Sequence, residues 1–136
     1  MKKILVIDGQ GGRLGGELVE KLLNCDGDFE IIAIGTNASA TESMIKAGAK
    51  MCATGENPVV FNSKTADIIV GPIGIVIANS LLGEVTPKMS IAVGESPAKK
   101  ILIPINKCDN FVITSQTNNF KELVDMAIEK VIRELA

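Results

Sequence analysis

The stretch ILVIDGQGGRLGGELVEKL, residues 4–22, decides the fold class of this chain. It starts with a continuous apolar run that ends at Asp8, passes through a glycine-rich loop, and enters a segment with apolar residues at helical spacing. A continuous apolar run is typical of a strand that is covered on both faces, as in a parallel sheet. Residues 3–8 are therefore predicted to form a buried strand and residues 14–24 an amphipathic helix.

The same alternation of strand and helix continues along the chain. Further strands are predicted at residues 30–34, 50–53, 67–70, 100–105 and, as a short last strand, 110–113. Helices are predicted at residues 39–49, 86–94 and 119–135, whereas residues 57–65 fit either a helical turn or a loop. This pattern predicts an α/β protein with a three-layer, doubly wound, mainly parallel sheet, in one domain that spans residues 1–136.

The composition argues against several classes of function. Of 136 residues, 46% are hydrophobic and 22% are charged, and the net charge is -2, so no overall field attracts nucleic acid. Four Phe are the only aromatic residues, which is too few for base-stacking surfaces. The most apolar tract, residues 68–82, is too short and too interrupted to span a bilayer. With no signal peptide ahead of the first strand, we expect a cytoplasmic protein that binds neither nucleic acid nor membranes.

The absence of certain residue types narrows the chemistry further. Three widely spaced Cys and no His predict free thiols, not a disulfide framework or a zinc site, and no other metal site is predicted. The lack of Tyr and His excludes the Tyr-Lys pair of short-chain dehydrogenases and all His-dependent acid–base catalysis. No P-loop motif occurs. The weak catalytic candidates that remain are Glu56, Asn79 and Lys107.

Four glycines follow the first strand, where dinucleotide-binding proteins carry their phosphate loop. The motif G-x-G-x-x-G fails at Leu14, but Gly9-x-x-Gly12-x-x-Gly15 and Gly9-x-Gly11-x-x-x-Gly15 resemble variants found in short-chain-type dehydrogenases and reductases. Glycines let the backbone approach a phosphate, which the free N–H groups of the helix start then bind. NAD or NADP is the cofactor to consider first. The alternative is a tight turn that packs strand on helix and binds nothing.

The predicted carboxyl ends of the other strands are small or polar, as expected at the edge of the sheet where ligands bind. Dinucleotide-binding proteins usually have an acidic residue that binds the ribose at the end of the second strand. This chain has Thr36 and Asn37 there, which weakens the dinucleotide interpretation. Asp8 would repel a phosphate unless paired, so it either caps the loop or holds a metal or a sugar hydroxyl. The predicted cofactor-binding residues are Asp8, Gly9, Gln10, Gly11, Gly12, Arg13, Leu14, Gly15, Gly35, Thr36, Asn37, Gly71 and Pro72.

Residues 73–82 form a helix-like run that is apolar on nearly all sides, with Asn79 and Ser80 inside it. Such a helix is either central or lies at an oligomer contact, so we expect a homo-oligomer.

Several segments, in order, resemble a known family: IDGQGG, IIAIGTNASAT, GAKMCATGEN, ADIIVGPIGIVIANSLLGEVTPKM and KKILIPINKC. They are similar to a family of short, uncharacterised bacterial Rossmann-like proteins that is classed as a domain of unknown function, over residues 3–113. The resemblance implies a stand-alone, Rossmann-like cytoplasmic protein and no particular activity. The fold class predicted from the strand and helix pattern is of the Rossmann-like, NAD(P)-binding type. Where that family's loop tends to have another Gly and an Ile, this chain has Arg13 and Leu14. Arg13 either reaches a phosphate or is simply exposed.

Three functions stay open at this point. The first is a binding or sensor subunit that holds a nucleotide or dinucleotide at the glycine loop. The second is a small NAD(P)-dependent oxidoreductase whose active site is shared between subunits, with Glu56, Asn79 or Lys107 contributing. The third is a structural or partner-binding module with an empty site.

Overall fold

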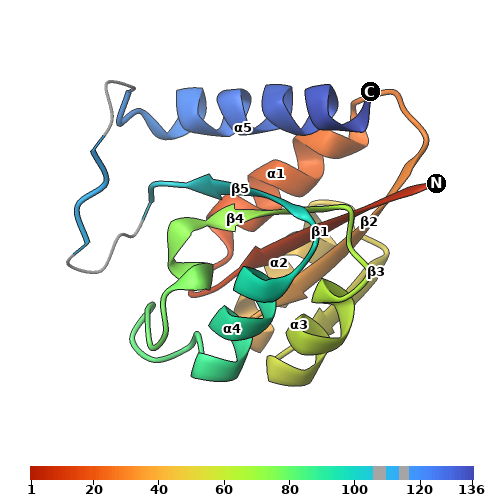
Figure 1. The fold of residues 1–136 in the computed structure, drawn as a ribbon. Coiled ribbons are helices and arrows are strands. Elements are labelled where there is room, and N and C mark those ends of the chain that lie inside the picture. Colours follow the sequence, from red (N-terminus) through yellow and green to blue (C-terminus); the bar gives the residue numbers. More distant parts are fainter. Residues whose placement is uncertain (106–109, 114–116) are drawn as a thin grey trace.

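The computed structural model describes residues 1–105, 110–113 and 117–136. These residues contain one all-parallel sheet with the strand order β3-β2-β1-β4-β5 (Figure 1). The strands are β1 (Lys2–Asp8), β2 (Phe29–Gly35), β3 (Met51–Thr54), β4 (Ile68–Pro72) and β5 (Lys99–Ile103). The order reverses between β1 and β4, and doubly wound sheets bind ligands at such a reversal, beyond the carboxyl ends of the strands. The predicted α/β fold with a parallel sheet is confirmed.

Helices cover both faces of the sheet and produce the three predicted layers (Figure 1). One face packs against α1 (Arg13–Leu23), α2 (Ala38–Lys46) and α5 (Phe120–Leu135). The other packs against α3 (Glu56–Ser63), α4 (Pro87–Glu95) and the short 3-10 helix η1 (Ile73–Val76). Strand β1 serves both cores, since Ile4 and Val6 pack on the first and Leu5 and Ile7 on the second. This double burial explains why β1 is apolar at consecutive positions.

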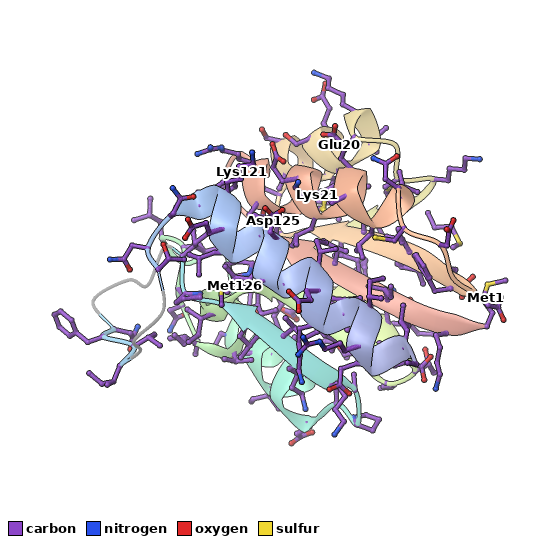
Figure 2. All side chains as sticks on the ribbon, turned by 90° about the horizontal axis from the view of Figure 1, so that it is seen from above. Met1, Glu20, Lys21, Lys121, Asp125 and Met126 are labelled. Atoms are coloured by element: carbon purple, nitrogen blue, oxygen red, sulfur yellow. The ribbon has the colours of Figure 1, made fainter. Side chains whose placement is uncertain are left out.

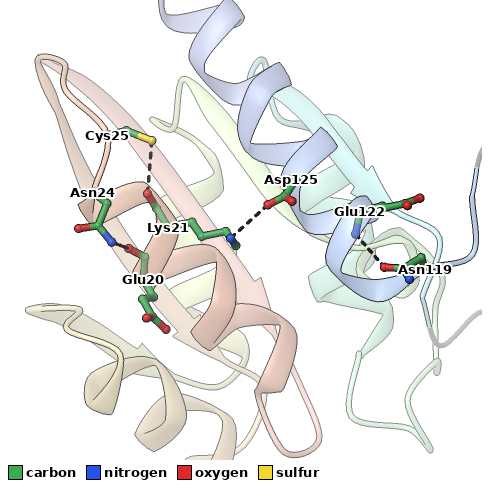
Figure 3. A network of polar contacts seen from close by, with 7 residues as sticks. All are labelled: Glu20, Lys21, Asn24, Cys25, Asn119, Glu122 and Asp125. Carbon is green, nitrogen blue, oxygen red and sulfur yellow. Dashed lines mark hydrogen bonds and ion pairs between the residues drawn. The ribbon is translucent and has the colours of Figure 1, made fainter.

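Local signals in the sequence account for the ends of two helices. Thr86 is the N-cap of α4, and its Oγ1 accepts a hydrogen bond from the Met89 N–H at 3.2 Å. Asn119 caps α5 in the same way, with Oδ1 accepting from the Glu122 N–H at 3.1 Å (Figure 3). Both helices begin at the residues that the sequence predicts.

Helix α5 lies across the sheet beside α1 (Figure 2). Lys21 Nζ of α1 forms an ion pair with Asp125 Oδ1 of α5 at 3.1 Å (Figure 3). At the other end of α1, the Arg13 guanidinium lies over the Phe120 ring, 3.9 Å from its centroid. Within the described ranges, no helix is long and apolar enough to cross a bilayer.

The structure corrects two predicted elements and settles a third. Residues 57–65, left open by the sequence, lie mostly in α3. Residues 73–82 are not a continuous helix, because η1 ends at Val76 and the backbone then turns through positive φ. Residues 110–113 lie outside the sheet, so the predicted last strand is wrong. A short apolar segment becomes a strand only when it is buried against neighbours, whereas Phe111 and Ile113 are 92% and 96% exposed.

Candidate functional site at the carboxyl edge of the sheet

The ends of β1 and β2 bring most of the predicted site residues together. The register pairs Asp8 with Gly35, the last residues of the two strands. Beyond them, the Thr36 N–H donates to the Asp8 carbonyl at 2.9 Å, and Asn37 Nδ2 donates to the Gln10 carbonyl at 3.0 Å. The glycine loop and the start of α2 therefore lie side by side.

Asp8 holds the glycine loop from within. Its Oδ1 accepts from the Gly9 N–H at 2.8 Å, and its Oδ2 accepts from the Gly15 N–H, in the first turn of α1, at 2.6 Å. The side chain is buried, and the pKa of Asp8 is raised to about 6, mainly by this burial. The two N–H donors lower the pKa in part, and the nearby Glu84 charge raises it. Asp8 thus places a carboxylate at the helix terminus where a ligand phosphate would otherwise sit.

Glu84, which sequence reasoning missed, completes the site from a distant segment. Its Oε1 accepts three hydrogen bonds: from the Gln10 N–H at 2.8 Å, from Thr36 Oγ1 at 2.6 Å and from Asn37 Nδ2 at 2.7 Å. Burial by itself raises the pKa of Glu84, but these donors outweigh it and hold the pKa below its usual value.

No motif in the sequence points to Glu84, and it is the structure that places it in the segment after β4, where the strand order reverses. Its carboxylate reaches the end of β2, the position where dinucleotide-binding proteins carry their own acidic residue. That residue is absent from β2 itself, where Thr36 and Asn37 stand instead.

Two glycines of the loop are explained without a ligand. Gly12 has φ 75°, and a Cβ on it would lie 2.7 Å from the Ala40 Cα of α2. A Cβ on Gly15 would lie 2.7 Å from Met44 Sδ. These positions let α1 approach α2 closely, so they support the interpretation of the loop as a tight turn.

The other two glycines differ from each other. A Cβ on Gly9 would meet Thr36 Oγ1 at 2.6 Å and Leu81 Cδ1 at 2.7 Å, so this position is also filled by its neighbours. Gly11 has no atom within 4 Å of an added Cβ, and its φ is not positive. Packing does not require a glycine there, and the space beside Gly11 is open.

Two loop residues point away from this site. Arg13 is exposed, as one of its two expectations has it, and its guanidinium stacks on Phe120 of α5. The Leu14 side chain is 4% exposed and packs in the core beneath α1, so only the backbone of Leu14 is available for contact with a ligand.

The predicted site residues further along the carboxyl edge of the sheet are explained by packing. A Cβ on Gly35 would collide with Thr41, and one on Gly71 would collide with the Ile7 carbonyl oxygen. Pro72 is buried at the end of β4 and precedes η1. These three positions offer no polar side chain to a ligand.

The two candidate catalytic residues that the structure describes, Glu56 and Asn79, do not join the network around Glu84. Glu56 is the first residue of α3, where a carboxylate interacts favourably with the helix dipole. Asn79 is exposed, with φ 65°, and its N–H donates to the Val85 carbonyl at 2.7 Å. Lys107 lies outside the described residues. In the part of the chain that the structure describes, no three His, Cys, Asp or Glu side chains gather as a metal site requires.

Two of the predicted free thiols can be placed. Cys25 and Cys52 are free and half-buried, and burial raises the pKa of the Cys52 thiol. The Cys25 Sγ donates to the Lys21 carbonyl within α1 (Figure 3). Neither thiol belongs to the site, and Cys108 lies outside the described residues.

The strand order 3-2-1-4-5, the glycine loop after β1 and the polar cluster at the ends of β1 and β2 define a Rossmann-like α/β protein. The chain belongs to the family described as Domain of unknown function (DUF3842), whose model matches residues 3–136. No curated protein matches the chain. Among solved structures, it is similar to a dodecameric FMN-dependent Ubix-like decarboxylase from Escherichia coli O157:H7. The TM-score is 0.48 at 13% identity, over 96% of this chain and 75% of that chain.

Proposed function

We propose that this protein is a nucleotide-binding or sensor protein, and that oxygen atoms of the ligand take the place of the Glu84 carboxylate. One observation carries this proposal: three donors from two different loops converge on Glu84 Oε1 at 2.6–2.8 Å. Such a set of one backbone N–H, one hydroxyl and one amide suits a phosphate or ribose oxygen equally well. It lies beside the reversal of strand order, the usual ligand position in this kind of sheet.

The open position at Gly11 indicates where the ligand approaches. A phosphate there faces the glycine loop, while Thr36 and Asn37 are within reach of the attached sugar. Glu84 must withdraw for this to happen, since its charge repels a phosphate and its oxygen uses the same donors. NAD and NADP stay the first cofactors to test. The free thiols Cys25 and Cys52 suit the reducing cytoplasm in which we place the protein.

The test is ligand-dependent thermal unfolding, followed by circular dichroism or calorimetry because the chain has no Trp or Tyr. The panel is NAD, NADP, FAD, ATP and AMP. A ligand at a hundredfold excess over its Kd stabilises the folded state by about 2.7 kcal/mol. For the ligand that binds, we expect Glu84→Gln to tighten the Kd about tenfold, or ~1.4 kcal/mol, by removing the competing charge.

A matched pair of variants serves as the specificity control. Gly11→Asp adds a negative charge at the mouth of the loop, and Gly94→Asp makes the same change on the exposed side of α4. Neither position has an atom within 4 Å of an added Cβ, so both variants are expected to fold. Gly11→Asp should abolish the stabilisation and Gly94→Asp should retain it. Gly12→Asp is unsuitable here, because a Cβ at Gly12 would collide with Ala40 whether or not a ligand binds.

The opposite results are also informative. If Glu84→Gln weakens binding, the carboxylate contacts the ligand directly, as it would a sugar hydroxyl, and our account of competition is wrong. If no nucleotide stabilises the wild type or Glu84→Gln, the proposed function is wrong.

A second candidate, a partner-binding module with an empty site, rests on a separate observation. Gly9, Gly12 and Gly15 are all accounted for by close packing, and Asp8 and Glu84 already satisfy several donors of the loop. The failure of every nucleotide in the panel would favour this candidate. The third, an NAD(P)-dependent oxidoreductase, additionally requires turnover that consumes or produces NAD(P)H.

A further inference from the structure

A groove of about 400 Å³ is lined by side chains of α3 and α4. These two helices lie on the face of the sheet opposite α5 (Figure 1). The apolar lining of the groove includes Val60 of α3 and Ile91 and Ala92 of α4, and its charged rim includes Lys88 and Glu95. Ile91 is 55% exposed and lies within this apolar lining.

The packing of α4 explains which residues it presents to solvent. Met89 and Val93, four residues apart, are buried in the core beneath the helix. The positions opposite them are Lys88, Ile91, Ala92 and Glu95, which follow the spacing i, i+3, i+4 and i+7 and so share one face. This outer face has a basic end, an apolar middle and an acidic end.

The order of these four residues is self-complementary. If a second helix lies antiparallel, with a two-fold axis passing between Ile91 and Ala92, each Lys88 faces Glu95 of the partner subunit. Each Ile91 then faces the partner subunit's Ala92. A two-fold contact requires this reciprocity, in which residue i meets residue j and j meets i.

The two charges are available for such a contact. Within the residues that the structure describes, neither Lys88 nor Glu95 takes part in an ion pair. We propose that the outer face of α4 docks on a second copy of this chain, with two symmetric Lys88–Glu95 ion pairs flanking the apolar middle. Val60 of α3 extends the apolar area beside α4.

This surface differs from the segment for which the sequence suggested an oligomer contact. Residues 73–82 were expected either at the centre of the fold or at an oligomer contact, and Ile75 and Leu81 are each 1% exposed and pack in the core, whereas Leu82 is 96% exposed. The outer face of α4 is instead both apolar at its centre and matched in charge to itself.

The test is sedimentation velocity over a wide range of protein concentration, at low and high salt. We expect a monomer–dimer equilibrium that shifts towards the monomer as salt is added. Lys88→Glu and Glu95→Lys should each weaken dimerisation about tenfold, because each places like charges opposite one another. The double variant Lys88→Glu/Glu95→Lys should restore the wild-type Kd. Lys50→Glu, an exposed charge reversal elsewhere, is the control and should change nothing.

Restoration by the double variant is the decisive result, because a structural effect of either single change would not be reversed by the other. Ile91→Asp gives a second measure and should disperse the dimer. The proposal is wrong if the wild type stays monomeric at every concentration. It is also wrong if a dimer forms and neither charge reversal nor Ile91→Asp affects it. Circular dichroism spectra of all variants confirm that they are folded.

Discussion

Two carboxylates bind the glycine loop, and they come from segments that are far apart in the sequence. Asp8 binds the Gly9 and Gly15 N–H groups from its own strand, while Glu84 binds the Gln10 N–H from a segment far along the chain. Their pKa values move in opposite directions because burial dominates at Asp8 and hydrogen-bond donors dominate at Glu84. The loop is thus ordered by internal anions even when nothing is bound.

The glycines of the loop can be told apart by substitution with alanine. Gly12→Ala should destabilise the fold by about 2–4 kcal/mol, since positive φ and a Cβ contact of 2.7 Å with Ala40 both oppose it. Gly11→Ala should leave stability within about 0.5 kcal/mol of the wild type, because its Cβ points into open space. Urea unfolding measures both. Equal losses at the two positions would refute the distinction.

At the level of elements, Asn37 couples α2 to the segment between η1 and α4. Its Oδ1 accepts from the Ala40 N–H at 2.8 Å and so caps α2, while its Nδ2 donates to Glu84 at 2.7 Å. One side chain therefore serves a helix start and a long-range contact at once. The position of Glu84 depends on α2 being in place.

This coupling is measurable by a double-mutant cycle on Asn37→Asp and Glu84→Gln. Asn37→Asp keeps the capping oxygen but turns a donor into a carboxylate that faces Glu84, so it should be destabilising. The loss should be smaller by about 1 kcal/mol when Glu84 is already Gln, because the repulsion between carboxylates is gone. Chemical unfolding of the wild type and three variants supplies the cycle. Additivity within about 0.5 kcal/mol would show that the two residues are independent.

For the whole molecule, the two carboxylates predict how stability responds to pH. The pKa of Asp8 rises from 3.8 to about 6 on folding, so the stability it contributes is fully present below 3.8 and is lost as pH rises through 6. The pKa of Glu84 is lowered from 4.5, so its contribution is present above 4.5 and is lost as pH falls through its folded pKa.

Variants of the two residues should therefore respond to pH in opposite ways. The cost of Asp8→Asn in free energy of unfolding should be greater at pH 4 than at pH 7, by as much as ~3 kcal/mol for a shift of this size. The cost of Glu84→Gln should shrink as pH falls below 4.5. Denaturant unfolding across this pH range provides both curves. Parallel curves for the two variants would contradict the opposite pKa shifts.

The sequence predicted most elements because their signals are local. The apolar run at β1, the Thr86 cap and the stripe of α5 each report a preference within a few residues. The failures have a tertiary cause. Within residues 73–82, Ile75 enters the core from the short η1 and Leu81 from a turn with positive φ at Asn79, Leu81 and Leu82, and not from one continuous helix. No local sequence pattern predicts such a turn, because its strained backbone is stabilised by contacts with the surrounding structure.

The sequence by itself determined the class of fold and the place of the glycine loop, because strand and helix periodicity and the spacing of glycines are properties of neighbouring residues. Only the tertiary structure decided what fills the site. Glu84 reaches Gln10 and Thr36 across a large separation in sequence, and Gly12 meets Ala40 through the packing of two helices. Such contacts depend on how the segments are arranged in space, and that arrangement follows from burial of the whole core.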